Sequence, residues 1–398
     1  MYKITKFYKI GLCFAFFSEF IAIYPLYNLI FKDSGISPIY IATLLIIQKT
    51  SKMLFDIPSG FIADIYGRRS IFIFGIMLKI GMLLLFLIKP CFISFAIAMT
   101  MWGIAMSCFF GNEAAYTYDF LRIKKSENKF SRFMGIYYVA QNIATAMACF
   151  VGGILYDGGN AQMAIILSIF MMLVTLFFAL QLPKYTNNQM NIVFPNENKI
   201  TKNNFSSYLS CISNPKTMFF VVLLAISTAL FLFFFDLSTV IMNDHNYSIK
   251  TVSIVVGIVA SIRILGNLIS GFIAPKTPIS FILSLMILLV SFVGFGATTN
   301  NTIVVIAISC YLIFFTLIDL TITTKMQIFI NSQLRATVMS ISNLFASILL
   351  IALHFINGYI AEQESYMVAT LNIMSIIFCL LLFMIIAYIY AFRDKSSN

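Results

Sequence analysis

The chain has 398 residues, of which 60% are hydrophobic and 10% are charged. This composition excludes a soluble globular protein and is typical of a polytopic membrane protein. The formal net charge of +11 does not indicate nucleic-acid binding, because the basic residues are spread over successive loops. His245 and His354 are the only imidazoles and no Cys-x-x-Cys pair occurs, so we expect neither a metal site nor a cofactor.

Apolar windows of about 20 residues, the length that crosses a bilayer, predict twelve membrane-spanning helices. The predicted spans are 8–31, 38–63, 70–89, 91–118, 133–156 and 161–182, then 217–242, 249–273, 278–297, 302–325, 335–358 and 367–392. Residues 184–215 are hydrophilic and predict a cytoplasmic linker. We therefore expect an all-α membrane protein with one six-helix bundle at 1–183 and a second at 216–398.

The lysine and arginine residues are concentrated in every second loop, and this asymmetry predicts how the chain is oriented in the membrane. With the N-terminus inside, the outer loops keep only Lys32, Lys89 and Lys250, while the many other loop lysines and arginines are cytoplasmic. By the positive-inside rule, both termini are expected to be cytoplasmic. Abundant Ile, Phe, Lys and Asn suggest an AT-rich genome, which makes the bacterial cytoplasmic (inner) membrane the expected location.

A charged motif ends the second predicted span and opens the third. Residues 60–69 follow the pattern Gly-x-x-x-Asp-x-x-Gly-Arg-Arg, formed by Gly60, Asp64, Gly67, Arg68 and Arg69. Gly60 would let a neighbouring helix approach closely, Gly67 would permit a tight turn, and the charges require water or partners. The motif resembles the signature between the second and third helices of the major facilitator superfamily of secondary transporters. That resemblance implies a cytoplasmic loop whose charges latch the inner gate.

An internal repeat agrees with this resemblance. The stretch Ser-Gly-Phe-Ile-Ala occurs at residues 59–63 and again at 270–274, and Lys52 and Asp56 match Arg263 and Asn267 at the same displacement. Repeated halves of this kind are found in transporters built from two pseudo-symmetric bundles. The second copy lacks the acid and the arginines, so only the N-terminal half carries a complete gate motif.

Several ionisable side chains fall within predicted spans, where each would cost roughly 2.5–3.5 kcal/mol if it faced lipid. They are Glu19, Lys49, Lys52, Lys79, Asp236, Arg263 and Asp319. In the superfamily, the first, fourth, seventh and tenth spans line the central cavity, which the second, fifth, eighth and eleventh flank. The resemblance thus implies Glu19 and Asp236 on the cavity walls, with Lys52 and Arg263 beside them.

The candidates for substrate or proton coupling are accordingly Glu19, Lys49, Lys52, Asp236 and Arg263. In one interpretation Glu19 exchanges a proton or binds substrate. In the other, the acids form fixed ion pairs, Glu19 with Lys49 or Lys52 and Asp236 with Arg263. Further candidates for the cavity lining are Tyr24, Tyr27, Tyr137, Tyr138, Gln141 and Asn142.

The cytoplasmic end of the fourth span carries two more acids, Glu113 and Asp119, which are six residues apart and so do not share a helical stripe. We assign both to the cytoplasmic gate. Asp119 is expected to pair with Arg68 or Arg69, as an acid at this place does in the superfamily. Residues 331–340, at the start of the eleventh span, also resemble the family and would present a helix N-terminus to Asp64.

These features predict a secondary transporter that works by alternating access, with proton-coupled export of drugs or metabolites as the favoured function. We expect a small-molecule solute, H⁺ as the coupling ion, a lipid environment and a monomer. Two departures from the pattern of the superfamily's drug/proton antiporters weaken the prediction of proton antiport. Those proteins often carry an arginine early in the fourth span, which is missing at Trp102-Gly103-Ile104, and a Gly-Pro followed by two glycines in the fifth span, of which only the final pair, Gly152 and Gly153, is present. The alternatives are uptake of an anionic or zwitterionic nutrient, or a non-transporting sensor or scaffold. A membrane enzyme would need a cluster of catalytic residues, and the sequence offers no candidate for one, so we do not expect an enzyme.

Overall fold

The computed structural model defines residues 4–88, 91–156, 160–184, 215–244, 247–248, 251–258 and 335–366, with scattered positions between 261 and 386. The predicted coupling residue Arg263 lies outside these residues, as do Asp319, the span at 278–297 and most of the linker. Contacts divide the chain into two compact units, residues 1–200 with 249–260, and residues 201–248 with 261–398. We call them unit 1 and unit 2.

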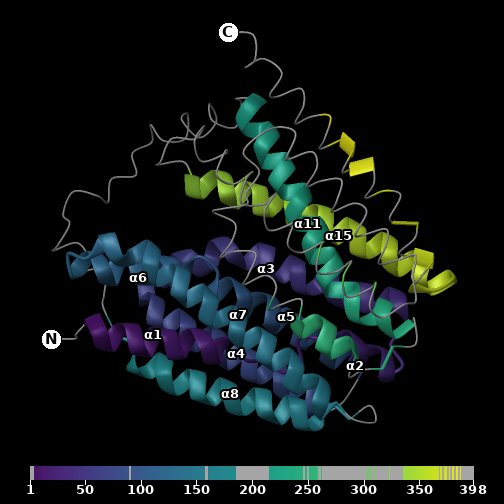
Figure 1. The fold of residues 1–398 in the computed structure, drawn as a ribbon, viewed down its shortest axis with the longest axis horizontal. Helices are drawn as coiled ribbons and strands as arrows, with labels where there is room; N and C mark the ends of the chain where they lie inside the picture. Colours follow the sequence, from purple (N-terminus) through teal and green to yellow (C-terminus); the bar gives the residue numbers. More distant parts are fainter. Residues whose placement is uncertain are drawn as a thin grey trace. The chain divides into compact units, whose positions relative to one another are not determined.

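Every regular element in the defined residues is helical (Figure 1). Unit 1 contains α1 (Ile4–Ser18), α2 (Tyr27–Asp33), α3 (Pro38–Tyr66), α4 (Arg68–Ile88), α5 (Phe92–Phe109), α6 (Asn112–Ile123), the 3₁₀ turn η1 (Glu127–Lys129), α7 (Phe130–Leu155) and α8 (Gln162–Gln181). Unit 2 contains α11 (Pro215–Asp244) and α15 (Arg335–Gln363). Six helices in the defined part are long and apolar enough to cross a membrane. An all-helical membrane fold is therefore confirmed, whereas the number twelve stays a prediction.

The first predicted span is not one helix, which corrects the continuous segment expected at 8–31. Helix α1 ends at Ser18 and α2 begins only at Tyr27. Pro25 explains the break, because proline lacks an amide hydrogen and its ring clashes with the carbonyl four residues before it. Within the break, the Ala22 amide donates to Ser168 Oγ of α8 at 2.9 Å. The neighbouring helices thus satisfy part of the backbone that the break frees.

The fourth predicted span is interrupted as well. Helix α5 ends at Phe109 and α6 begins at Asn112, with Gly111 between them at a φ of +75°. Gly67 likewise separates α3 from α4 at a φ of +86°. Backbone angles of this sign strain residues that carry a Cβ, so both turns depend on glycine.

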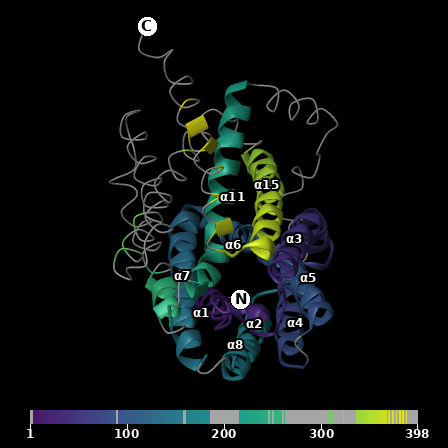
Figure 2. The same ribbon diagram turned by 90° about the vertical axis from the view of Figure 1, so that its right-hand side faces the viewer.

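The helices of unit 1 pack in a connected set (Figures 1 and 2). Helix α5 lies against α3 and α4, α1 lies against α7 and α8, and α4 also contacts α8. In unit 2, α11 packs on α15. Among the defined residues no atom lies within 4 Å of a Cβ built on Gly60, so the close helix approach expected there is not found. It occurs instead at Gly103 of α5.

At Gly103 the backbones of α3 and α5 are in contact. A Cβ built on Gly103 would lie 2.9 Å from the Lys52 amide nitrogen and 2.9 Å from Ser51 Cβ. Ser107, one turn later on α5, donates to the Lys52 carbonyl at 2.8 Å. Small residues at such a contact let membrane helices approach closely, which is the main source of their association.

We expect Gly103→Ala to lower the free energy of unfolding by about 1–3 kcal/mol, because the added methyl group must push two backbones apart. The measurement is the thermal unfolding midpoint of the purified protein in detergent. Gly135→Ala on α7 is the control, since a Cβ there meets no defined atom within 4 Å. Equal midpoints for the two variants would contradict the close α3–α5 contact.

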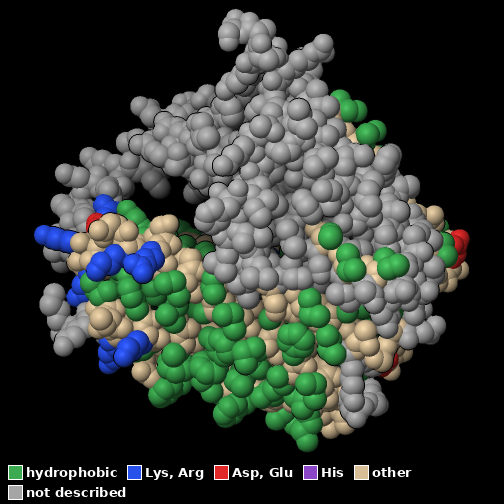
Figure 3. Space-filling view, in the orientation of Figure 1, with side chains coloured by type: hydrophobic (Ala, Val, Ile, Leu, Met, Phe, Trp, Pro, Cys, Tyr) green, Lys and Arg blue, Asp and Glu red, His purple; other side chains and the backbone are tan. Residues whose placement is uncertain are grey.

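The surface of unit 1 is apolar along its helices and basic at one end (Figure 3). The exposed apolar side chains of α8 recur every three or four residues and form a lipid-facing stripe: Met163, Ile166, Phe170, Leu173, Phe177 and Leu180. Lys125, Lys129 and Arg132 are exposed around η1. That this end faces the cytoplasm stays a prediction.

Candidate functional site

A buried lysine is the centre of the polar groups in unit 1. Lys79 lies on α4 and its side chain is 2% exposed. Its Nζ donates to the Ser18 carbonyl at 2.9 Å and to Glu19 Oε1 at 3.3 Å, and it lies 4.6 Å from the centroid of the Phe109 ring. The ammonium group therefore occupies the carboxyl end of α1, where free carbonyls favour a cation. It also joins the two interrupted spans, because Phe109 is the last residue of α5.

This pairing differs from the pairs expected from the sequence. The sequence predicts Lys49 or Lys52 as the partner of Glu19, but its lysine partner is Lys79. Lys52 instead pairs with Asp56 on its own helix at 2.9 Å, and its Nζ lies 4.5 Å from the Phe110 ring centroid. Lys79 reaches the end of α1, where it bonds both the Ser18 carbonyl and Glu19, whereas Lys52 is taken up by Asp56.

The second carboxylate oxygen of Glu19 accepts a hydrogen bond from the Tyr24 hydroxyl at 3.0 Å. The Tyr24 ring stacks on Trp102 with centroids 5.6 Å apart, and Tyr27 meets the same indole edge-on at 5.2 Å. The Glu19 side chain is 27% exposed, unlike Lys79 behind it. Glu19 thus offers an accessible carboxylate whose charge is balanced from the buried side.

Glu113, assigned to the gate from the sequence, contacts α7 rather than the gate arginines. Its Oε1 accepts from the Tyr137 hydroxyl at 2.8 Å, and both of its oxygens accept from Gln141 Nε2 at 3.2 Å. Glu113 lines a narrow pocket among α1, α4, α6 and α7, together with Phe7, Gly11, Phe14, Phe72, Tyr116, Thr117, Phe133, Tyr137 and Leu182. It is the one charged side chain in that lining.

The charged motif forms a compact cluster around Arg68 of α4. The guanidinium donates to Asp119 Oδ2 at 3.1 Å, to Asn112 Oδ1 at 3.1 Å and to Asp64 Oδ1 at 3.2 Å. It thereby ties the end of α3 to the first residue of α6 and to Asp119 farther along the same helix. The sequence indicated Asp64 and Asp119 but not Asn112, which no motif marks.

Two further bonds hold the end of α8 beside this cluster. Arg69 Nη2 donates to the Leu180 carbonyl at 2.6 Å, and the Tyr116 hydroxyl donates to the Pro183 carbonyl at 2.7 Å. Both acceptors are backbone groups at the helix end, where carbonyls lack intrahelical partners. Arg68 and Arg69 therefore have different partners, an acidic cluster and a helix terminus.

In unit 2, Asp236 of α11 lies 3.2 Å from His354 Nε2 of α15. The imidazole is fully buried, and its ring centroid is 5.4 Å from that of Phe233. The expected partner Arg263 lies outside the defined residues, and the sequence does not predict His354 as a partner. Within the defined residues no three His, Cys, Asp or Glu side chains are grouped so that they could hold a metal ion.

Comparison with known proteins places the chain in a broad context. The family model described as the Major Facilitator Superfamily matches residues 10–354. No curated protein sequence matches the chain. A crystal structure of a mutant of the nucleoside transporter NupG has a TM-score of 0.78 at 13% identity, over 97% of this chain and 98% of that one.

Two other solved structures are similar in the same way. A mutant of the peptide transporter POT in complex with sulfate has a TM-score of 0.71 at 14% identity, over 96% of this chain and 94% of that one. A bacterial homologue of the human lysosomal transporter Spinster has a TM-score of 0.70 at 14% identity, over 96% and 95%. At such identities the likeness shows a common fold alone.

Proposed function

The chain belongs to the Major Facilitator Superfamily and is a multi-pass membrane transporter, and we propose that it exports drugs or metabolites in exchange for protons. The proposal includes twelve spans in two bundles, 1–183 and 216–398, joined by a cytoplasmic linker at 184–215. It places a monomer in a bacterial inner membrane with both termini inside. Alternating access would arise from rocking of the two bundles about a site near the bilayer midplane.

The accessible carboxylate of Glu19 carries the proposal. Lys79 balances its charge from the buried side, while Tyr24 fixes the orientation of the second oxygen. A solute at this carboxylate would meet hydrogen-bond acceptors beside an aromatic wall of Tyr24 and Trp102. Such a site suits a solute with an apolar body and a cationic or N–H donor group.

The same geometry argues against two of the basic residues, Lys52 and Lys79, as ligands of an anionic solute. The anionic alternative depends on Lys49, Lys52, Lys79 and Arg263, of which Arg263 lies outside the described residues. Lys79 is buried and already bonded to Glu19 and Ser18. Lys52 is paired with Asp56. A solute anion would have to displace an existing partner of either lysine and would itself be repelled by the carboxylate of that partner.

We expect lipophilic cations, rather than carboxylates or zwitterions, to raise the thermal unfolding midpoint of the purified protein. A ligand at about 100 times its dissociation constant stabilises the folded state by roughly 2.7 kcal/mol. Glu19→Gln should abolish this stabilisation, because the amide cannot balance a cation. Glu127→Gln, at an exposed acid of η1, is the matched control and should bind like the wild type.

Stabilisation by carboxylates alone, or an unchanged ligand shift in Glu19→Gln, would refute the proposed site. Ligands found in this way are then added to everted membrane vesicles that hold a pH gradient, reported by a pH-sensitive dye. Exchange predicts that the ligand dissipates the gradient in vesicles with the wild-type protein. An unaffected gradient would exclude proton coupling while leaving solute binding in place.

A further inference from the structure

The two acids near the interrupted spans have different surroundings. Glu19 has an ammonium partner in Lys79, whereas the donors that the structure gives Glu113 are the neutral groups of Tyr137 and Gln141. Lys79 is buried and Glu19 is the carboxylate that lies against its ammonium group, so the Glu19 charge compensates Lys79. No cationic group is among the hydrogen-bond donors that the structure gives Glu113. When two acids lie in environments that differ in this way, they take different chemical roles.

The walls of the Glu113 pocket are mostly aromatic. Six of its ten lining residues are Phe or Tyr, and among them only the Tyr137 hydroxyl is bonded to the carboxylate. An ionised carboxylate with neutral partners in an apolar pocket is costly when water is excluded and tolerated when water enters. The carboxyl group is therefore suited to gain and lose a proton as access to the pocket changes.

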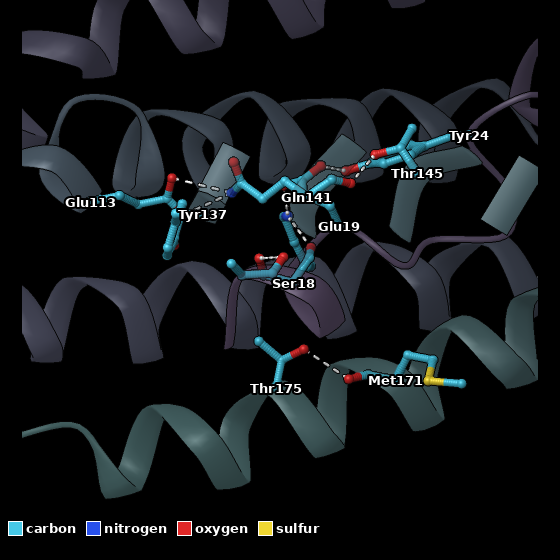
Figure 4. Close-up of polar contacts among 11 residues, drawn as sticks. Ser18, Glu19, Tyr24, Glu113, Tyr137, Gln141, Thr145, Met171 and Thr175 are labelled. Carbon is cyan, nitrogen blue, oxygen red and sulfur yellow. Dashed lines mark hydrogen bonds and ion pairs between the residues drawn. The ribbon is translucent and has the colours of Figure 1, made fainter. Parts of the chain in front are cut away.

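Glu113 also interacts electrostatically with the candidate solute site. In the part of the chain that the structure defines, the titratable and charged groups that face it are Glu19, Lys79, Tyr116, Tyr137 and Tyr138. Tyr137, Gln141 and Thr145 follow one another at intervals of four residues along α7. Figure 4 shows Gln141 reaching toward Glu113, with Glu19 and Tyr24 farther along the same row.

Resting on the proposed export function, we propose that Glu113, and not Glu19, carries the proton that is exchanged for the solute. A cation bound at Glu19 adds positive charge near Glu113 and favours its ionised form, so the proton leaves. Protonation of Glu113 removes a negative charge near the site and weakens cation binding. Cation binding weakens proton binding by the same free energy as proton binding weakens cation binding. Because the two ligands disfavour each other, the protein exchanges them rather than carrying them together.

Glu113 also lies close to the Arg68 cluster, so a change in its charge can act on the proposed gate. It follows Asn112, the first residue of α6, whose side-chain oxygen accepts from Arg68. A change in charge at Glu113 thus occurs one residue away from the Arg68 cluster. The negative form is favoured by its position in the first turn of α6, where free amides lie.

The test is infrared difference spectroscopy of the full chain in lipid, which detects protonated carboxyl groups without any solute. The pH is changed between about 6 and about 9, a range in which exposed carboxyl groups, with an ordinary pKa of about 4, stay ionised and give no band. The wild type should show a titrating carboxyl band that Glu113→Gln loses and Glu19→Gln keeps. Glu113→Asp, which retains a carboxyl group, should keep a band, and Tyr137→Phe should move its midpoint. A merely structural role for Tyr137 would leave the midpoint unchanged.

The outcomes separate the two proposals. A band that disappears in Glu19→Gln but persists in Glu113→Gln would overturn the assignment of the proton to Glu113 and leave proton coupling intact. A wild-type spectrum without any titrating carboxyl band would refute both. Thr117→Val changes an uncharged residue of the same pocket and should keep the wild-type band, so a loss there would attribute the effect to pocket collapse and overturn the proposal.

Discussion

Replacing Lys79 by methionine is expected to lower the free energy of unfolding by about 1–3 kcal/mol, the cost of leaving hydrogen-bond acceptors without their charged donor. Methionine has nearly the volume of the lysine stem, so little of this loss comes from packing. What remains is the uncompensated Glu19 carboxylate and the unbonded carbonyl of Ser18. The measurement is equilibrium or thermal unfolding of the purified protein in detergent.

A second substitution isolates the charge. In the double variant Lys79→Met, Glu19→Gln no buried charge is left unpaired, so most of the lost stability should return, as a double-mutant cycle would show. Lys52→Met is the matched control. It breaks an i,i+4 pair with Asp56 that is partly exposed and is worth only about 0.3–0.5 kcal/mol. Equal losses for Lys52→Met and Lys79→Met, or no rescue by Glu19→Gln, would contradict the central position of Lys79.

The charge partner of Glu19 could not be read from the sequence. Lys49, Lys52 and Lys79 all lie within predicted apolar spans, and each carries the same insertion cost. Which lysine meets Glu19 depends on how α1 and α4 pack, a contact between residues 60 positions apart. Hydropathy reports that a lysine must have a partner, but not which partner it has.

The break in the first span, by contrast, has a local signal in the sequence. Pro25 marks it, and a window of average hydropathy cannot register a single proline. The break matters because it frees the Ser18 carbonyl and places Glu19 outside a helix. Gly111 gives the same kind of local signal before α6. The apolar windows otherwise locate the helices of unit 1 well, with boundaries that differ by a few residues.

The contacts of the gate motif could be predicted from the sequence only in part. Spacing places Asp64 and Arg68 on adjoining helix ends, and the resemblance to the superfamily implies that Asp119 pairs with Arg68 or Arg69. Asn112 bonds Arg68 at 3.1 Å but belongs to no recognisable pattern. Asp236 and His354 show the same limit in unit 2, since 118 residues separate them. Long-range polar pairs follow from packing, which sequence periodicity does not determine.

Arg68→Ala is expected to abolish transport, because one guanidinium joins the end of α3 to α6 through three acceptors, Asp64, Asn112 and Asp119. Arg68→Lys keeps the charge but lacks the planar fork, so it can satisfy only part of this set. A charge-assisted hydrogen bond is worth about 1.5–3 kcal/mol. If one such bond differs between the gate states, transport falls about tenfold or more in Arg68→Lys.

The loss of transport on neutralising each acid of the cluster should increase with the burial of that acid. Asp119 is 17% exposed and Asp64 is 61% exposed, so Asp119→Asn should impair transport more than Asp64→Asn. Arg69→Lys is the control, because a lysine can still donate to the single Leu180 carbonyl. Transport is measured in everted vesicles with a solute identified by thermal stabilisation, and each variant is compared at equal protein content. Full activity in both Asp64→Asn and Asp119→Asn would show that the cluster is a fixed structural tie and not a gate, since a latch that opens must weaken when its acceptors lose their charge.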